Sequence, residues 1–357
     1  MKNNRTFLEK LLDGAEVECK KLCEVSEIEK GKQLNKALLA ETGEYPVING
    51  GINPSGYWHE YNNEANTIVI SQGGASAGYV NWMTTPFFAG AHAYVVKANE
   101  TLVQKRYAYH FLKMNQVKFM QNQYGAGIPA LAKSDLANLL IPIPPLSVQT
   151  EIVRILDALT ALTSELTSEL TLRRKQYEYY REKLLSFDSL EQLNSGGGKK
   201  KLIDVVKIKN GKDWKHLGEG NIPIYGSGGI MGYVDTYSYD KPTVLIPRKG
   251  TITNIFYLEE PFWNVDTIYY TEIDTTQILP KYFYHFMKTV NLTKLDTGSG
   301  RPSLTQAILN EIPIFVPSIE EQHRIVSILD KFETLTNSIT EGLPLAIEQS
   351  QKRYEYY

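Results

Sequence analysis

The sequence repeats itself once with a period of about 175 residues, and this duplication constrains the fold more than any other feature. Five blocks return in the same order: Tyr107–Lys113, Gly125–Leu131, Ile141–Ile143, Gln149–Asp157 and Lys175–Tyr180 return as Tyr282–Lys288, Gly298–Leu304, Ile312–Ile314, Gln322–Asp330 and Lys352–Tyr357. Solenoid repeats are about 20–50 residues long, so this period is too long for a solenoid. The 357 residues therefore predict two homologous domains, each followed by the same additional segment.

Each repeat begins with a globular part in which short strand-like runs alternate with turns. Thr67–Ile70 and Thr243–Ile246 are β-branched runs of the kind that form strands. Glycine-rich stretches such as Gly226–Gly229 mark turns between such runs. We expect α+β domains at residues 1–145, which include a short N-terminal helix, and at residues 199–316.

Each globular part is followed by a helical segment, at residues 146–190 and 317–357, with the heptad pattern of a coiled coil. The predicted seam is apolar and aromatic, and consists of Ile152, Leu156, Leu159, Leu166, Leu170 and Tyr177 in the first segment and Ile325, Leu329, Phe332 and Ile339 in the second. Four residues are inserted in the second segment around Gly342–Leu345, which predicts a stutter. Pro344 removes a helix hydrogen bond, so we expect the second helix to be kinked there.

Composition and motifs argue against a membrane protein and against an enzyme. No stretch reaches the roughly 18 consecutive apolar residues of a membrane span, so we expect a cytoplasmic protein. The chain has two cysteines, no P-loop, no GxSxG elbow and no HExxH pair, so we predict neither a catalytic residue nor a metal site. His110 and His285 recur at one position of the repeat, which favours a shared packing role over ligation.

The charge distribution permits nucleic-acid binding without demanding it. The net charge is −2, but the acidic excess lies in the two helical segments and the remainder is mildly basic. The loops between the shared blocks differ, since Gln72 in the first copy lies opposite Arg248 in the second. Bidentate amides suit adenine edges and bidentate arginine suits guanine edges in the DNA major groove. Solvated loops without a ligand are the alternative reading of the same difference.

Several blocks resemble Type I restriction-modification specificity (S) subunits. The block Ile141–Asp157, repeated as Ile312–Asp330, resembles the junction into the helical spacers of that family. The blocks Gly125–Leu131 and Gly298–Leu304 resemble the ends of its target recognition domains, and Leu11–Val17 resembles its usual start. The resemblance implies an α+β chain of two homologous α/β target recognition domains. Two long helices would separate them and form an antiparallel coiled coil in a pseudo-twofold circular arrangement.

The resemblance also implies a function. Each domain would read one half of a split, asymmetric target in double-stranded DNA, and the coiled coil would set the distance between the halves. The chain would be non-catalytic and would bind no cofactor itself. It would recruit two methyltransferase (M) subunits, which bind S-adenosylmethionine and methylate adenine at N6. Restriction (R) subunits, which use ATP and Mg and cut DNA, would join that complex.

This sequence departs from the family pattern at the end of its second helix. That helix stops at Tyr357, whereas the first continues through Arg181–Leu185. Phe7–Leu12 resembles the latter stretch and could supply the missing turns, which would close the circle. The alternative is that the second helix is truncated.

The candidate DNA-contacting residues follow from loop position and side-chain type. They are Gln72, Ser76, Asn81 and His92 in the first domain, and Arg248, Lys249, Thr251, Thr253 and Asn254 in the second, with Arg301 as a phosphate contact. Three alternatives stay open: the specificity subunit of another restriction-modification type, a tandem coiled-coil scaffold that binds no DNA, and an enzyme with an unrecognised site.

Overall fold

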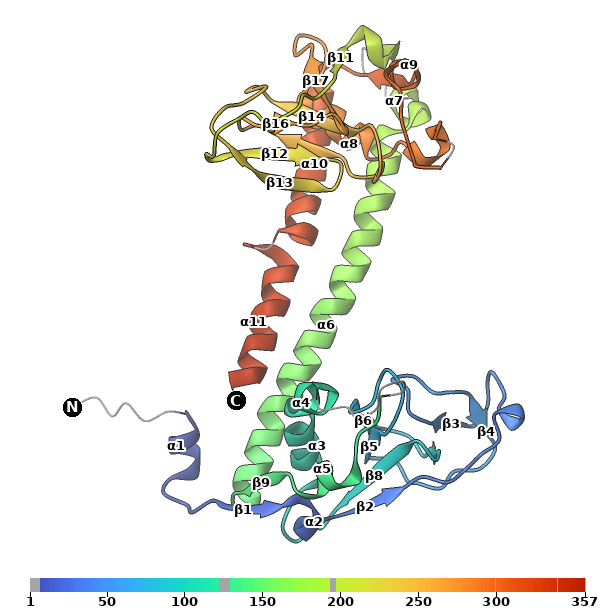
Figure 1. The fold of residues 1–357 in the computed structure, drawn as a ribbon, viewed down its shortest axis with the longest axis vertical. Helices are drawn as coiled ribbons and strands as arrows, with labels where there is room; N and C mark the ends of the chain where they lie inside the picture. Colours follow the sequence, from blue (N-terminus) through green and yellow to red (C-terminus); the bar gives the residue numbers. More distant parts are fainter. Residues whose placement is uncertain (1–6, 122–128, 193–196, 299, 339, 357) are drawn as a thin grey trace, which may run out of the picture. The chain divides into compact units, whose positions relative to one another are not determined.

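The computed structural model describes residues 7–121, 129–192, 197–298, 300–338 and 340–356 (Figure 1). The chain divides into two compact units. The first comprises Met1–Glu165 together with Glu348–Tyr357, and the second comprises Leu166–Ile347. Each unit contains one globular domain and parts of the long helices.

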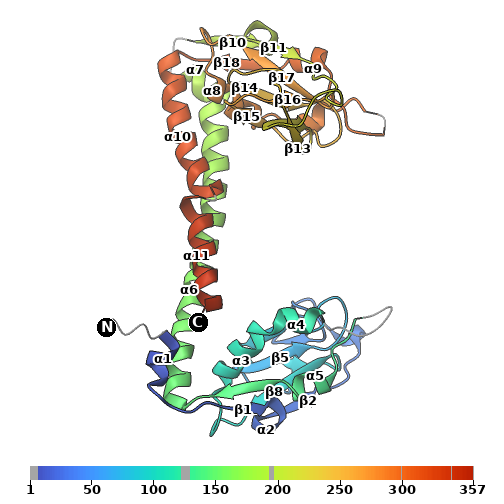
Figure 2. The same cartoon turned by 60° about the vertical axis from the view of Figure 1, so that its left-hand side comes forward.

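The globular domain of the first unit mixes short strands with short helices. Its elements are α1 (Phe7–Leu12), β1 (Glu18–Lys21), α2 (Leu22–Val25), β2 (Ser26–Lys30), η1 (Lys36–Leu38), β3 (Tyr45–Ile48), β4 (Tyr57–Trp58), β5 (Thr67–Ser71), β6 (Val80–Met83), β7 (Phe88–Ala89), β8 (Ala93–Ala98), α3 (Lys105–Met114), α4 (Gln116–Gln121), α5 (Lys133–Ala137) and β9 (Leu140–Ile143). The strands form sheets in the orders β2-β8-β5-β6, β4-β3-β7 and β1-β9. Helix α3 packs on the four-stranded sheet (Figure 2).

The domain of the second unit repeats this topology strand for strand. Its elements are β10 (Gly198–Lys201), η2 (Leu202–Asp204), β11 (Val206–Lys209), β12 (Ile222–Gly226), β13 (Gly229–Val234), β14 (Thr243–Pro247), β15 (Phe256–Leu258), β16 (Trp263–Asn264), β17 (Ile268–Ile273), α8 (Pro280–Met287), η3 (Leu292–Leu295), α9 (Gln306–Asn310) and β18 (Pro313–Val316). The sheets run β11-β17-β14-β15, β13-β12-β16 and β10-β18, in the same relative order as in the first domain. The predicted duplication of an α/β domain is therefore confirmed.

The core of each domain lies between its four-stranded sheet and the helix that follows. In the first domain, Ile68 and Ile70 of β5 pack with Leu112 of α3. In the second, Val244 and Ile246 of β14 pack with residues of α8 that include Phe283. The β-branched runs that predicted strands form these central strands, because such side chains fit a buried pleated surface.

The helical segments differ in continuity. The first is a single helix, α6 (Leu146–Leu185), which is followed by the short α7 (Phe187–Gln192). The second consists of two helices, α10 (Ile319–Asn337) and α11 (Gly342–Tyr356).

The prediction of one second helix kinked at Pro344 was wrong. The helix is interrupted after Asn337, and Pro344 lies in the first turn of α11. A proline is tolerated there because the first N–H groups of a helix have no acceptor within the helix. Gly342 begins α11 with φ +80°, a conformation that favours glycine.

Within each unit, residues of the two helical segments contact each other. In the first unit, the hydroxyls of Thr163 and Ser350 lie 2.8 Å apart, and the buried Leu156 belongs to the same stretch of α6. In the second unit, Tyr177 stacks on Phe332 with ring centroids 6.3 Å apart.

The other seam residues vary in burial. Ile325 and Leu329 are fully buried in the core of the second domain, and Ile152 packs against the core of the first. The half-buried members are Leu159, Leu166 and Leu170, while Ile339 lies outside the described residues. In the described part of the chain, no helix is both long and apolar enough to cross a lipid bilayer.

Candidate nucleic-acid interface

In the second domain, four chain segments converge around residues 247–254, which we name the second variable loop. The N–H of Arg248 donates to the carbonyl of Thr267 (2.9 Å), and the carbonyl of Arg248 accepts from the N–H of Leu304 (2.8 Å). The N–H of Gly250 donates to the carbonyl of Pro302 (3.0 Å). Backbone hydrogen bonds on both sides thus fix the start of this loop.

The first domain makes the corresponding backbone hydrogen bonds around residues 71–78, which we name the first variable loop. We call this shared set of hydrogen bonds the loop frame. The N–H of Gln72 donates to the carbonyl of His92 (2.8 Å), and its carbonyl accepts from Leu131 N–H (2.7 Å). The N–H of Gly74 donates to the carbonyl of Pro129 (2.9 Å). Gln72 is therefore the structural counterpart of Arg248, as the sequence alignment had it, and His92 is the counterpart of Thr267.

In each domain, a buried tyrosine donates a hydrogen bond to a backbone carbonyl of the loop frame. The hydroxyl of Tyr94 donates to the carbonyl of Leu131 (3.4 Å), and that of Tyr269 donates to the carbonyl of Leu304 (3.2 Å). Burial raises the pKa of both tyrosines, so both hydroxyls keep the proton that they donate.

The candidate residues of the first domain lie around this frame. His92 is exposed, Ser76 is half-buried in the loop, and Asn81 reaches from β6 to the carbonyl of Ile52 (3.4 Å). Oε1 of Gln72 is buried and accepts no hydrogen bond from the described residues. The structure therefore brings Gln72 and His92 together directly.

The candidate residues of the second domain also lie around its frame. The guanidinium of Arg248 donates to the carbonyl of Asp266 (3.3 Å) and lies over the ring of Tyr269. Asn254 uses its amide to hold the carbonyl of Ser227 (3.1 Å). The exposed members are Lys249, Thr251, Thr253 and Arg301. The second surface is thus cationic, whereas the first presents amide, hydroxyl and imidazole groups.

Two glycine-rich segments were predicted only as turns. They are residues 50–53 and residues 226–229, which we name the first and second glycine turns. The hydroxyl of Ser71 donates to the carbonyl of Gly51 (3.0 Å), and the N–H of Ser227 donates to Oγ1 of Thr267 (3.4 Å). Each glycine turn is therefore bonded to the frame of its variable loop. The signal in the sequence was the recurrence of a glycine-rich stretch at the same place in both copies.

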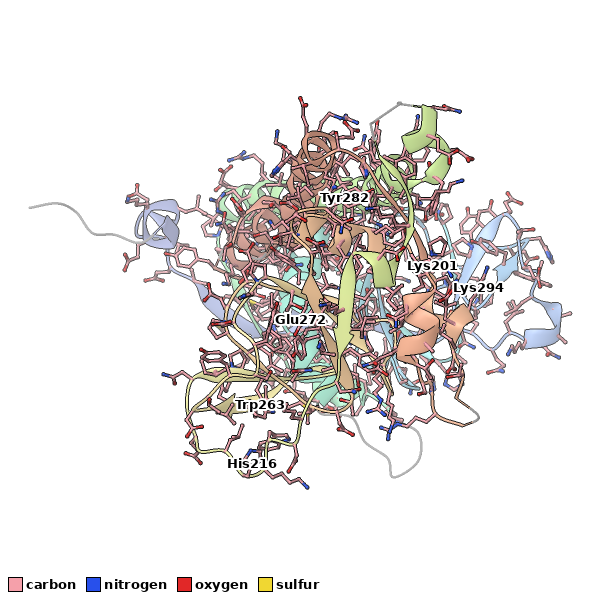
Figure 3. The ribbon with its side chains drawn as sticks, turned by 90° about the horizontal axis from the view of Figure 1, so that it is seen from above. Lys201, His216, Trp263, Glu272, Tyr282 and Lys294 are labelled. Atoms are coloured by element: carbon pink, nitrogen blue, oxygen red, sulfur yellow. The ribbon has the colours of Figure 1, made fainter. Side chains whose placement is uncertain are left out.

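A lysine-containing loop of the second domain is held to strand β16. The N–H of Lys212 donates to the carbonyl of Asn264 (2.9 Å), and the indole N–H of Trp263 donates to the carbonyl of Lys212 (3.2 Å). Trp263 and His216, labelled in Figure 3, meet edge to face with ring centroids 6.1 Å apart. The exposed side chains of Lys212 and Lys215 are suited to phosphate contacts.

Away from the loops, each domain is joined to both helical segments by polar groups around a buried histidine, which we name a helix clamp. In the first clamp, His110 of α3 places Nε2 2.8 Å from Oδ1 of Asp157 in α6 and Nδ1 2.8 Å from the hydroxyl of Tyr354 in α11. In the second clamp, His285 of α8 places Nε2 2.9 Å from Oδ1 of Asp330 and Nδ1 3.4 Å from the hydroxyl of Tyr177.

The electrostatics of the clamps favour neutral histidines. Only 3% of His110 and none of His285 is exposed, and burial lowers the pKa of both imidazoles. Burial raises the pKa of Tyr354 to about 12, so this phenol remains a donor. The partners therefore assign the tautomer in which Nε2–H donates to the aspartate and Nδ1 accepts from tyrosine. The predicted packing role of the histidines is thus extended to hydrogen bonding.

The second clamp also brings His285, Asp330 and Glu333 close enough to hold a cation, since their ligand atoms lie within 4.8 Å of one another. Protein donors already occupy these carboxylates. The ammonium of Lys281 lies 2.7 Å from Oδ2 of Asp330, and the hydroxyl of Tyr284 donates to Glu333 (2.9 Å). The arrangement is that of an ion pair within a hydrogen-bonded network.

A buried glutamine anchors each helical segment to its domain. Gln149 accepts from the N–H of Gln104 (2.9 Å) and donates to the carbonyls of Leu102 and Pro144 (both 2.9 Å). Gln322 makes the same three bonds, to Leu279, Gln277 and Pro317. Both glutamines are fully buried, and each satisfies three backbone groups.

The chain is similar to proteins of one known family. Residues 15–172 and residues 194–349 match the type I restriction modification DNA specificity domain. The chain is 44% identical to a putative type I restriction enzyme specificity subunit of Haemophilus influenzae, with 100% of this chain and 98% of that protein covered. It is 33% identical to a type I restriction enzyme specificity subunit of Escherichia coli, with 99% of this chain and 95% of that protein covered.

The fold has a counterpart among solved structures. The crystal structure of the S subunit of a type I restriction-modification system from M. genitalium aligns with a TM-score of 0.67 and 25% identity. The alignment covers 96% of this chain and 93% of that one. Both the duplicated α/β domains and the long helices therefore have a parallel in that protein.

Proposed function

The chain belongs to the family of type I restriction-modification DNA specificity subunits, and from this premise we propose that each of its domains reads one half of a split DNA sequence. The observation that supports this most is the shared loop frame. The same backbone hydrogen bonds hold Gln72 beside His92 in one domain and Arg248 beside Thr267 in the other. A constant frame that carries different donors and acceptors is suited to the same task on two different base sequences.

The two surfaces would read different half-sites. A glutamine amide can make two hydrogen bonds to an adenine edge, and a guanidinium can make two to a guanine edge. The amide-rich first surface therefore favours an A·T pair in the first half-site, and Arg248 favours a G·C pair in the second. The exposed Lys249 and Arg301 would add phosphate contacts, which position the protein without reading sequence.

The helices would set the spacing between the half-sites. Helix α6 has 40 residues and passes without interruption from the first unit into the second. At about 1.5 Å per residue, it is roughly 60 Å long. Two sites one DNA turn apart are separated by about 34 Å. A helix of fixed length therefore selects one range of spacer lengths.

The chemistry would reside on partner subunits. We infer that the chain recruits two methyltransferase (M) subunits, which bind S-adenosylmethionine and methylate adenine at N6. Restriction (R) subunits that use ATP and Mg would join them and cut unmodified DNA. In this assembly the present chain contributes sequence recognition, and it would act in the cytoplasm, where the DNA lies.

The decisive test is methylation mapping. DNA from cells that express this chain with its M subunit is compared, by long-read sequencing, with DNA from cells that express M alone. We expect N6-methyladenine in a split motif only when both are present. Unchanged methylation, with M shown to be folded and bound to this chain, would contradict the proposal.

A further inference from the structure

The second glycine turn is followed by a side chain that the sequence did not single out. Strands β12 and β13 change register, so that Ile224 pairs with Gly232 and Tyr225 pairs with Ile230. Met231 is the extra residue of this β-bulge. Bulges redirect a side chain out of the regular alternation and are common next to functional sites. The side chain of Met231 is 58% exposed.

The bulge places Met231 over the glycine turn. A Cβ atom built on Gly226 would lie 2.5 Å from Sδ of Met231 and 3.5 Å from Oγ1 of Thr267. The glycine therefore leaves room for the methionine side chain next to Thr267. The carbonyl of Thr267 accepts from the N–H of Arg248, so Met231 and a residue that holds the second variable loop both adjoin Gly226.

We propose that Met231 is a specificity-determining residue, and that its thioether side chain contacts the 5-methyl group of a thymine in the major groove of the second half-site. This inference rests on the proposed function and names one base feature that the second domain reads. Proteins recognise the thymine methyl group by apolar contact. The cationic groups of this surface, at Arg248 and Lys249, are not suited to that contact. The flexible, polarisable thioether of Met231 is suited to this apolar contact.

The first domain presents a comparable side chain. Ile52 lies in the first glycine turn, is 48% exposed, and has its carbonyl held by Asn81 of β6. Single exposed apolar residues are ordinary on protein surfaces. Ile230 and Tyr233 of β13 are also exposed, at 53% and 56%. Met231 is distinguished from these residues because the bulge redirects it and Gly226 makes room for it.

The test uses the complex of this chain with its M subunit and a duplex that carries the mapped target. Each thymine of the second half-site, on either strand, is replaced in turn by uracil, which lacks only the 5-methyl group. At one position we expect binding to weaken about 3- to 5-fold, as the transfer free energy of one methyl group implies. The Met231→Ala complex should bind the thymine and uracil duplexes equally.

The matched control is Ile203→Ala, which truncates another exposed aliphatic residue of the same domain, in η2 and outside the variable-loop frame. It should keep the wild-type preference for thymine. Three results would overturn the inference: no uracil position weakens binding, Met231→Ala keeps the preference, or the second half-site contains no A·T pair. Failure of the proposed function is distinct, since it would leave no sequence-dependent methylation to map.

Discussion

The two halves of the chain agree most closely where polar side chains share the same hydrogen-bond partners and least at the variable loops. Gln149 and Gln322 make the same three hydrogen bonds, and His110 and His285 bind an aspartate and a tyrosine in the same way. Gln72 and Arg248, in contrast, share only their backbone frame. Buried polar groups lose much free energy without their partners, so duplicated domains keep them. The side chains of Gln72 and Arg248 have no such shared set of partners, and they differ.

The two helix clamps also correspond in the cation that binds each aspartate. In the first, Arg106 binds Asp157 (2.7 Å), and its guanidinium carbon lies 4.7 Å from the ring centroid of Trp82 and 4.6 Å from that of Tyr109. In the second, Lys281 binds Asp330 from the corresponding position. The histidine and the aspartate are the same in both clamps, while the cation beside them differs. The connection of domain to helices is thus a common property of both halves.

The largest effect is expected from the place where the second helical segment is interrupted and the first is not. Deletion of Gly342–Leu345 removes the start of α11, including the positive-φ Gly342 and the buried Leu343. If the remaining residues join as helix, the segment shortens by about 6 Å. We expect sequence-specific methylation to be lost or to move to a different spacer length, as methylation mapping would show. An unchanged motif would mean that this segment does not set the spacing. Glu341→Ala, an exposed neighbour, should leave the motif unchanged.

Next in size is the loss of a buried glutamine. Gln149→Leu leaves one backbone N–H and two carbonyls without partners, and each unsatisfied buried group costs about 1–3 kcal/mol. We expect the free energy of unfolding to fall by about 3 kcal/mol or more, measured by urea denaturation. Gln322→Leu should have an effect of the same size. The exposed Gln351→Leu is the control, and an equally small effect in all three variants would refute the shared anchoring role.

The sequence predicted the duplication and the central strands because these depend on local pattern. The runs Thr67–Ile70 and Thr243–Ile246 lie within β5 and β14. The heptad pattern predicted a coiled coil, yet it could not tell a helix–helix seam from a helix–domain contact. Ile325 and Leu329 were assigned to the seam and are buried in the core of the second domain.

Other features depend on residues that are distant in sequence. His110 and Tyr354 are 244 positions apart, and no periodicity links them. The interruption before Gly342 was hidden because Pro344 is compatible both with a kinked helix and with the first turn of a new one. The variable loops were located because the copies diverge there. The glycine turns were passed over because glycine-rich stretches are ordinary turn signals.

A smaller and more selective effect is expected from the variable loops. Arg248→Ala should relax the preference at one base pair of the second half-site by about 1–3 kcal/mol, if the guanidinium reads a base. The first half-site should keep its sequence. Gln72→Ala is the matched variant and should relax only the first half-site. Motif mapping of both variants tests this, and a uniform loss of affinity without any change of motif would assign Arg248 to phosphate.

The last effect concerns pH, and it should be common to both halves. Burial lowers the pKa of His110 and of His285 below the usual 6.5, an effect that their aspartate partners only partly offset. Arg106, Tyr109 and Tyr354 also face the first imidazole. Lys281, Glu333, Tyr284 and Tyr177 face the second.

The direction of the pH dependence of the free energy of unfolding follows from which state of the chain binds more protons. Below pH 6.5 the unfolded chain protonates both histidines while the folded chain does not, so the free energy of unfolding falls with falling pH until the lowered native pKa is reached. Each histidine adds a slope of at most about 1.4 kcal/mol per pH unit. The double variant His110→Gln/His285→Gln should flatten urea midpoints measured between pH 7 and pH 5, whereas the exposed His323→Gln should not. A slope that survives in the double variant would show that the clamps are not its source.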